Sequence, residues 1–567
     1  MPNQTFDRSP HSILISGREL AGPLRTGASI AQFKILQSAW PLVVFLALAL
    51  SSLAYFSAPN IIGLFHDDGI YAVVAKSLSE GSGYRIISLP GEPYQTKYPM
   101  LYSYLLSWLW TLNPQFPDNV SLLHFVTVFF YFVSLLLAYV LYLQNTEGGK
   151  ADAVLYLFLV GANAFVFSMT AYPLSDIPFM AVCLCCLALA NPANGFSATT
   201  KSIVLLAAGA GSAFLFRKAG TALIVAGLIY LLIARQRRQF YLYAAVVGCL
   251  ILPWVLWQAM HDGGTVGNPL LVYYQSYEMP AFYLAASDPG IAVNIVWGNL
   301  LYLVRTVDHQ MFLHVTPVFR VVIYPLMIWG LWSVVRQQNV FFNGFLLFYT
   351  VLILSWPWHP ARYLMPLLPV LLLSLFKGVQ AATAIIRPHA TKAWSAAIVP
   401  FVARIPIAIV AVLLSVWLWS YTQVNRTNHL TLWAGNRASY GWTGFDETFS
   451  WIEQNTRSDD VLATAYDPMY YLYTGRKAVR PWIHHPETYF YPYGNAEPHL
   501  GFVEEIRDSL DKLGVRFIIV NPLEGYSERV AAAELFANLL RSYSVEPELV
   551  FESSDSLHKI YALPAHQ

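Results

Sequence analysis

Residues 65–71 read Phe-His-Asp-Asp-Gly-Ile-Tyr and place two adjacent carboxylates, Asp67 and Asp68, shortly after the long apolar segment 36–56. An apolar run of this length is typical of a helix that crosses a membrane, so the pair stands where the chain leaves the bilayer. Two neighbouring carboxylates at such a boundary are costly to desolvate and repel each other. This favours a chemical role, as a general base or a metal ligand, over the alternative of a helix cap or a solvated loop.

The composition of the whole chain is that of a membrane protein. Of its 567 residues, 56% are hydrophobic and only 12% are charged, and the mean hydropathy is +0.46, beyond the range of soluble globular domains. The formal net charge of +1 gives no reason to expect a nucleic-acid partner. The four cysteines all fall within apolar runs, so neither a disulfide framework nor a soluble zinc site is indicated.

Apolar segments of spanning length predict about eleven transmembrane helices between residues 36 and 421. Residues 1–35 are polar and too long for the n-region of a cleaved signal, so we expect a cytoplasmic amino-terminal segment followed by a retained anchor. With this orientation most Lys and Arg residues lie on the cytoplasmic side. The odd number of spans then places residues 422–567 outside the cytoplasm. The expected spans are 36–56, 120–143, 151–170, 177–190, 203–216, 219–234, 241–259, 321–335, 341–356, 363–379 and 405–421.

The long outer segments lead us to expect chemistry on the outer face of the membrane. In the first outer loop, 57–119, residues 71–80 and 100–112 have helical periodicity but are too short or too aromatic to span, so we expect interfacial helices there. The first of them would place Asp67 or Asp68 near a helix N-terminus, where backbone N–H groups stabilise an ionised carboxylate. The other outer segments are 171–176, 261–320, 357–362 and everything after Tyr421.

Residues 422–567 have a mixed polar composition and are expected to form a small extracytoplasmic α/β domain. This segment contains no glycine-rich phosphate loop, nucleophile elbow or metal-ligand spacing, which favours recognition or support over catalysis. Helices are expected at 447–455, 500–513 and 528–543, and strands at 461–465, 515–520 and 559–563.

Five short motifs of the membrane part, taken in order and with their sidedness, resemble the GT-C superfamily of polyprenyl-phosphate-sugar-dependent glycosyltransferases. The resemblance lies near the protein mannosyltransferases and the aminoarabinose transferases that modify lipid A, and it covers most of the membrane part. The motifs are the acidic motif 66–72, the lysine-proline motif 97–102, a second acidic site at 174–178, the outer basic turn 217–220 and the arginine-tyrosine motif 360–366.

This resemblance implies an inverting glycosyltransferase that passes a sugar from a polyprenyl phosphate carrier to an acceptor on the outer face of the membrane. By analogy, Asp67 is the general base for the acceptor hydroxyl, and Asp68 orients the acceptor or its partner. The cations that the analogy assigns to the donor phosphate are Lys97, Arg217, Lys218 and Arg362. The remaining expected site residues, in substrate-binding or structural roles, are His66, Tyr71, Asp176 and Tyr363.

Simpler roles stay open for several of these residues. Arg217 and Lys218 could anchor two helices at headgroup level, and Asp176 could mark an ordinary helix start. Thr96 stands where aminoarabinose transferases carry an acidic residue, so the resemblance does not carry a metal site over. A divalent cation beside His66 and the acidic pair is a weak possibility, and the cofactor is left open.

The competing function is a polytopic transporter or flippase of lipid-linked sugars. It predicts ionisable residues near the centres of spans and an internal repeat, whereas the charges here gather at the outer boundary and no repeat is visible. A non-catalytic receptor would leave the acidic pair and the basic turn unexplained. The expected partners are a polyprenyl-phosphate sugar donor, a glycan, lipid or protein acceptor and membrane lipids, and the expected location is a bacterial inner (plasma) membrane.

Overall fold

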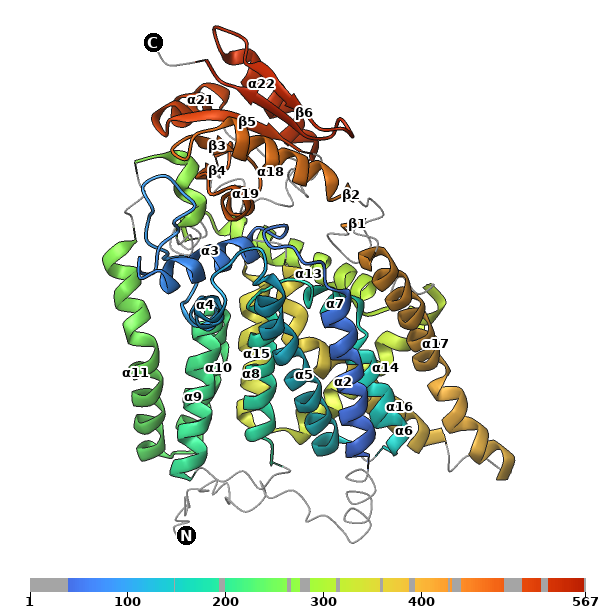
Figure 1. Ribbon diagram of the computed structural model, residues 1–567. Helices are drawn as coiled ribbons and strands as arrows, with labels where there is room; N and C mark the ends of the chain where they lie inside the picture. Colours follow the sequence, from blue (N-terminus) through green and yellow to red (C-terminus); the bar gives the residue numbers. More distant parts are fainter. Residues whose placement is uncertain are drawn as a thin grey trace, which may run out of the picture.

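The protein is a bundle of apolar helices that carries an α/β unit at one end, as the computed structural model in Figure 1 shows. Helix α2 (Trp40–Ser57) begins at the opposite end of the bundle and runs toward this unit. The expected cytoplasmic segment 1–35 lies outside the described residues. The residues that the structure describes are 39–146, 148–192, 199–262, 267–275, 286–312, 317–356, 360–386, 393–426, 429–430, 440–483, 502–521 and 529–564.

The bundle follows the apolar segments of the sequence and makes the chain an integral membrane protein. Among the described residues, 5 helices are long and apolar enough to cross a membrane. They are α2, α5 (Val120–Asn145), α11 (Arg237–His261), most of α13 (Pro289–Phe312), and the continuous run of η4 (Pro360–Leu367) and α16 (Leu368–Ile386).

Further apolar helices complete the bundle, and the expected number of about eleven spans stays a prediction. Helix α17 continues past Tyr421, the last residue of the expected final span. These helices are α8 (Asp176–Leu189), α9 (Thr200–Phe216), η2 (Lys218–Gly220) with α10 (Thr221–Ile233), α14 (Pro317–Gln337), α15 (Val340–Leu354) and α17 (Ala393–Arg426).

Two expectations about the spans are wrong. The outer segment 261–320 was expected to contain no span, yet it contains α13, whose apolar surface is interrupted by polar residues. One of these, Asn299, is buried and donates hydrogen bonds to the carbonyls of Leu354 and Trp356, at 2.9 and 2.6 Å. The expected span 151–170 is broken into α6 (Lys150–Gly161) and α7 (Ala164–Met169), because the Asn163 side chain caps a new helix.

Helices α14 and α16 pack against each other through two glycines. A Cβ atom at Gly330 would overlap the carbonyl of Ser374, and one at Gly378 would overlap the carbonyl of Leu326. Small residues of this kind let helix backbones approach closely where lipid provides no hydrophobic driving force.

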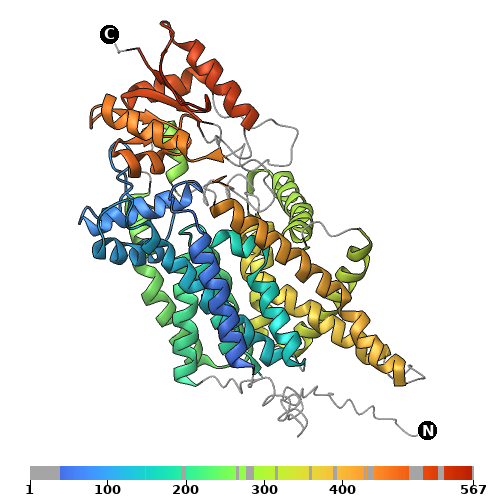
Figure 2. The same ribbon diagram turned by 45° about the vertical axis from the view of Figure 1, so that its right-hand side comes forward.

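The first outer loop contributes two helices that run across the end of the bundle, α3 (Asp67–Ser79) and α4 (Leu101–Leu112) (Figures 1 and 2). In α3 every residue from Asp68 to Ala75 is buried, so this helix is packed inside the protein. Helix α4 has two faces, since Tyr102 and Trp110 are buried while Trp108 and Leu112 are exposed. An exposed apolar face suits the interfacial position expected for this segment.

The α/β unit, residues 443–564, contains a sheet of order β4-β3-β5-β7-β6. Strand β3 is parallel to β4 and β5, and β7 is antiparallel to β5 and β6. The six expected elements correspond to α18, β3, α21, β5, α22 and β7, and the sequence analysis missed α19, β4 and β6. The bounds are α18 (Thr443–Asn455), β3 (Val461–Ala463), α19 (Asp467–Thr474), β4 (Ala478–Val479), α21 (Val503–Lys512), β5 (Val515–Val520), α22 (Arg529–Ser542), β6 (Glu548–Glu552) and β7 (Lys559–Ala562). A separate two-stranded ladder pairs β1 (His429–Leu430) with β2 (Tyr440–Gly441).

The unit is held against the first outer loop by backbone and side-chain contacts. The amide of Ala478 donates to the carbonyl of Ser88 at 2.9 Å, and Lys477 pairs with Glu92 at 3.0 Å. On the other side, the Asn268 side chain at the start of η3 (Pro269–Tyr274) donates to the carbonyl of Ser509 at 3.0 Å.

We predict that Gly330→Ala and Gly378→Ala each lower the melting temperature of the detergent-solubilised protein. The added methyl group must push α14 and α16 apart, at a cost of roughly 1–3 kcal/mol. Gly248→Ala in α11 is the matched control, because a Cβ there meets nothing within 4 Å. Differential scanning fluorimetry checks the prediction, and melting temperatures equal to that of the control variant would contradict it.

Candidate active site

The acidic pair opens α3, and its two carboxylates have different surroundings. His66, the N-cap residue, has φ 67° and ψ −57°, a conformation that costs energy in a residue other than glycine. Asp68 is fully buried, and its oxygens accept hydrogen bonds from the amides of Gly63 at 2.8 Å and Phe65 at 3.1 Å. Asp68 therefore fixes the loop that leads into α3.

Asp67 points the other way, toward the arginine-tyrosine motif. Its Oδ2 atom accepts from Nη1 of Arg362 at 2.6 Å, and its Oδ1 atom accepts from the hydroxyl of Tyr98 at 2.7 Å. The side chain of Asp67 is 17% exposed, so Asp67 is the member of the pair that a substrate can reach.

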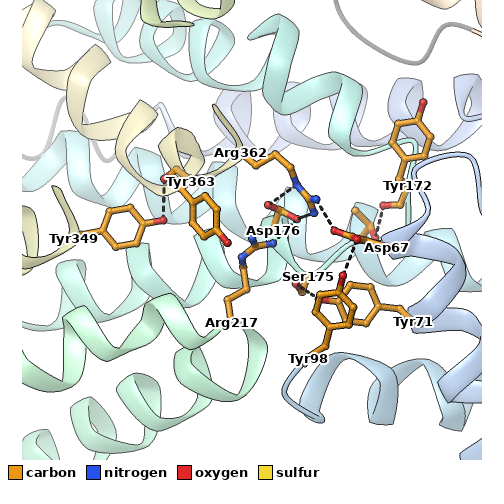
Figure 3. A network of polar contacts seen from close by, with 11 residues as sticks. Asp67, Tyr71, Tyr98, Tyr172, Ser175, Asp176, Arg217, Tyr349, Arg362 and Tyr363 are labelled. Carbon is orange, nitrogen blue, oxygen red and sulfur yellow. Dashed lines mark hydrogen bonds and ion pairs between the residues drawn. The ribbon is translucent and has the colours of Figure 1, made fainter. Parts of the chain in front are cut away.

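Arg362 joins Asp67 to the second acidic site (Figure 3). Its Nη2 atom donates to Oδ2 of Asp176 at 2.6 Å, and Nη1 of Arg217 lies 2.8 Å from the same oxygen. Asp176 is the first residue of α8, and Arg217 ends α9 at the basic turn. The turn is tight, since a Cβ at Gly220 would overlap the backbone of Phe214. Four of the five motifs thus meet in one network of charges, and the fifth, the lysine-proline motif, reaches it through Tyr98.

The different surroundings of Asp67 and Asp68 shift their pKa values in opposite directions. Burial by itself raises the pKa of Asp67, but the positive charges of Arg362 and Lys97, with the hydrogen bonds from Arg362 and Tyr98, hold it below the ordinary value. Burial raises the pKa of Asp68 to about 7, against the opposing effect of its backbone hydrogen bonds. Asp67 is the carboxylate that stays ionised at neutral pH.

The other expected site residues lie around this network. Lys97 donates to the carbonyl of Tyr273 at 3.0 Å and stands 3.4 Å from the centre of that ring. Tyr71 shares a hydrogen bond of 2.8 Å with Ser175. The guanidinium of Arg217 lies 4.8 Å from the ring centre of Tyr363.

Lys218 follows Arg217 in the basic turn and is half-buried in η2. Its carbonyl accepts a hydrogen bond of 2.7 Å from the hydroxyl of Thr221. An ion pair between Arg217 and Asp176 links the basic turn to the second acidic site.

His66 contacts a residue of the α/β unit that the sequence analysis did not single out. Its Nε2 atom lies 2.8 Å from Oδ1 of Asp467, and both side chains are buried. Arg480 follows β4, and its Nε atom lies 3.8 Å from the same oxygen. In the sequence, Asp467-Pro468 signals only a helix start, so nothing local marked this pairing.

The carboxylates of the site already have partners other than a metal. Asp67 and Asp176 accept from guanidinium groups, and Asp68 accepts from backbone amides. Within the part of the chain that the structure describes, no group of three or more His, Cys, Asp or Glu side chains is arranged to hold a metal ion.

The helical bundle, the cross-lying helices of the first outer loop and the charged network at their junction define a membrane-embedded protein of the GT-C fold. No protein-family model and no curated protein matches the chain. Solved structures of GT-C proteins, in contrast, match over most of its length.

One of these structures is ArnT from Cupriavidus metallidurans bound to undecaprenyl phosphate, with a TM-score of 0.53 and 14% identity over 92% of this chain and 97% of ArnT. The apo state of that protein matches with the same TM-score over 93% of this chain. Another is the archaeal oligosaccharyltransferase AglB from Archaeoglobus fulgidus, in complex with an inhibitory peptide and a dolichol-phosphate. It matches with a TM-score of 0.51 and 12% identity over 86% of this chain and 70% of AglB. Identities this low establish a common fold and leave the reaction to be argued from the site.

We predict that Asp68→Ala lowers the stability of the protein by about 2 kcal/mol, because it leaves the buried amides of Gly63 and Phe65 without an acceptor. Asp67→Asn should cost less, since Arg362 keeps its contact with Asp176. Thermal unfolding in detergent measures both, with Asp118→Ala at an exposed position of the same loop as the control. A melting temperature of the Asp68→Ala variant equal to that of the control variant would contradict the role assigned to Asp68.

Proposed function

We propose that the protein is an inverting glycosyltransferase that moves a sugar from a polyprenyl phosphate carrier to an acceptor at the end of the bundle covered by the α/β unit. The observation that supports this most strongly is the contact between Asp67 and Arg362, which sets a partly exposed carboxylate beside a cation in one buried network. The proposed place of action is the outer face of a bacterial inner membrane.

The fold is compatible with a lipid-linked donor. ArnT was solved with undecaprenyl phosphate and AglB with a dolichol-phosphate, so proteins of this fold bind polyprenyl phosphates. In the proposed reaction the acceptor is a hydroxyl of a lipid, glycan or protein, and the fold by itself does not select among these.

The charges of the site fit a phosphate ligand. Asp67 and Asp176 contribute two negative charges, and Arg217, Arg362 and Lys97 contribute three positive charges. The excess positive charge attracts the phosphodiester of a donor. It stabilises the leaving phosphate more strongly still, because that group gains one negative charge as the sugar leaves.

The proposed chemical step uses Asp67 as the general base. The acceptor oxygen attacks the anomeric carbon from the side opposite the phosphate, and its proton passes to the carboxylate of Asp67. The bond between the anomeric carbon and the phosphate oxygen breaks, and its electron pair stays on the phosphate. The configuration at the anomeric carbon is therefore inverted. Lys97, Arg217 and Arg362 are the proposed phosphate ligands, Lys218 is a further one at the edge of the site, and Tyr71 and Tyr363 shape the site.

The positions of the ionic residues distinguish this proposal from transport. Asp67 and Asp176 each begin a helix, and Arg217 ends one. A transporter of lipid-linked sugars requires polar groups near the middle of its helices, where the substrate crosses. In the described part of the network, the charges lie at one end of the bundle.

We predict that Asp67→Asn abolishes sugar transfer, with a loss of about a thousandfold or more, because the acceptor proton has no base. Binding of undecaprenyl phosphate to the purified variant should stay within about threefold of wild type, since the cations remain. Transfer is measured by mass spectrometry with undecaprenyl-phosphate-linked hexoses and pentoses and an extract of envelope lipids and glycoproteins. Asp118→Asn, an exposed substitution of the same kind, is the control. If a folded Asp67→Asn protein transfers sugar at the wild-type rate, Asp67 is not the base.

We further predict that Tyr98→Phe moves the acid limb of the pH–rate profile upward by about one pH unit. The Tyr98 hydroxyl stabilises the ionised form of Asp67, so its removal raises the pKa of that carboxyl. A base with a higher pKa becomes protonated, and inactive, at a higher pH as the solution is acidified. Tyr94→Phe in the same loop is the matched control, and its profile should coincide with that of wild type. Coincident acid limbs for Tyr98→Phe and wild type would refute the prediction.

A further inference from the structure

We propose that Asp467 of the α/β unit is a positioning residue for Asp67 and acts through the imidazole of His66. This inference rests on the proposed function for its kinetic consequence, and it makes a structural claim that stands without it. In this role, the α/β unit holds the start of α3 in the conformation that places Asp67, in addition to any part it has in recognition.

The backbone of His66 is strained and must be held by its surroundings. Its positive φ lies between two turns, in which the amide of His66 donates to the carbonyl of Gly63 at 3.2 Å and the amide of Asp67 donates to the carbonyl of Phe65 at 2.9 Å. The carbonyl of His66 accepts from Ile70 at 3.0 Å and so begins the helix. A strained residue at this point persists only if its surroundings hold it.

Asp467 is the partner that holds the side chain of His66. Asp467 is the first residue of α19 and is fully buried, and its Oδ1 atom lies 2.8 Å from Nε2 of His66. Arg480 contributes a positive charge 3.8 Å from the same oxygen, and its guanidinium lies 4.8 Å from the ring centre of Tyr273. The contact between His66 and Asp467 is therefore enclosed by the unit and by η3.

Helix α19 lies in close contact with the loop before α3 and with the first turn of α3. A Cβ at Gly63 would overlap Met469, and one at Gly69 would come within 2.8 Å of Cβ of Pro468. The glycines on both sides of the acidic pair thus allow α19 to lie directly on the loop. Asp68 ties the same loop from within, through the amides of Gly63 and Phe65.

Through these contacts, Asp467 affects the position of Asp67, which it does not touch. Asp67 follows His66 directly, and its carboxylate must meet both Arg362 and Tyr98. A change in the His66 backbone rotates the first turn of α3 and moves the Asp67 oxygens away from these partners. A misplacement of this size lowers the rate of the chemical step more than the binding of the donor.

The test compares variants of His66 and Asp467 in the full-length protein. Asp467→Ala should lower kcat about tenfold and leave the KM for the donor within about twofold. Asp467→Asn keeps an oxygen that can accept from His66 and should restore most of the rate. In the pair His66→Ala and Asp467→Ala, the double variant should be no slower than the slower single variant, because both act on one contact.

The matched control is Lys477→Ala, which removes a second side-chain ion pair between the unit and the first outer loop, that with Glu92. This pair is partly exposed and does not contact the acidic motif, so kcat and KM should both equal the wild-type values. An equal loss in Lys477→Ala and Asp467→Ala would show that the unit acts only by docking, and would overturn the assignment of a positioning role to Asp467.

Hydrogen–deuterium exchange of residues 61–72 separates this inference from the proposed function. Asp467→Ala should increase amide exchange at residues 63–70, whereas Lys477→Ala should not, and neither result requires sugar transfer. Wild-type protein that transfers no sugar from undecaprenyl-phosphate-linked donors would count against the proposed function only. Unchanged exchange at residues 63–70 in Asp467→Ala would overturn the positioning role, whatever the activity.

Discussion

The site depends on the bridge that Arg362 forms between Asp67 and Asp176. Its guanidinium donates to both carboxylates, each through a hydrogen bond of 2.6 Å. Desolvation of such charges is expensive, and a pair that loses one partner leaves an uncompensated charge at a cost of about 3–5 kcal/mol. The bridge therefore fixes the distance between α3, α8 and η4, three segments that the sequence separates widely.

Two layers hold this bridge in place. On the side of the bundle, Asp176 lies at the start of α8, Arg362 near the start of η4 and Arg217 at the end of α9. On the side of the α/β unit, α19 packs against α3 and the loop before it, at Gly63 and Gly69. The bundle thus supplies Arg217, Arg362 and Asp176, and the first outer loop supplies Lys97 and the partly exposed carboxylate of Asp67. The α/β unit covers the junction between these layers.

Much of this arrangement could be predicted from the sequence, because it is encoded locally. Apolar runs located most helices of the bundle, and a short apolar run located the buried strand β5 with the bounds that the structure gives it. Asp67, Asp176, Arg217 and Arg362 were selected from separate motifs, and the structure brings them into one network. Contacts over long sequence distances could not be predicted. The pairing of His66 with Asp467 spans 401 positions, and no local pattern around either residue indicates its partner.

Helix α13 was not predicted for a related reason. Its polar Asn299 lowers the apolar signal, and the carbonyl groups that satisfy it belong to the end of α15 and the residues after it.

The same bridge links donor binding to catalysis in the proposed reaction. In the structure, the three nitrogen atoms of the Arg362 guanidinium are all directed at carboxylates, two of them at Asp176 and one at Asp67. Each terminal nitrogen of Arg362 has a second N–H group, so a phosphate either binds there or displaces one of these acceptors. Asp176 is almost fully buried and also holds Arg217, whereas Asp67 is 17% exposed and keeps a second donor in Tyr98. Asp67 is therefore the acceptor that is more easily displaced. In the proposed reaction, a donor phosphate that displaces Asp67 from Arg362 removes the strongest of the charges that lower the pKa of Asp67. Asp67 then becomes a stronger base at the moment when an acceptor must be deprotonated. A site with a free carboxylate and a free arginine would lack this coupling between an occupied donor site and an active base.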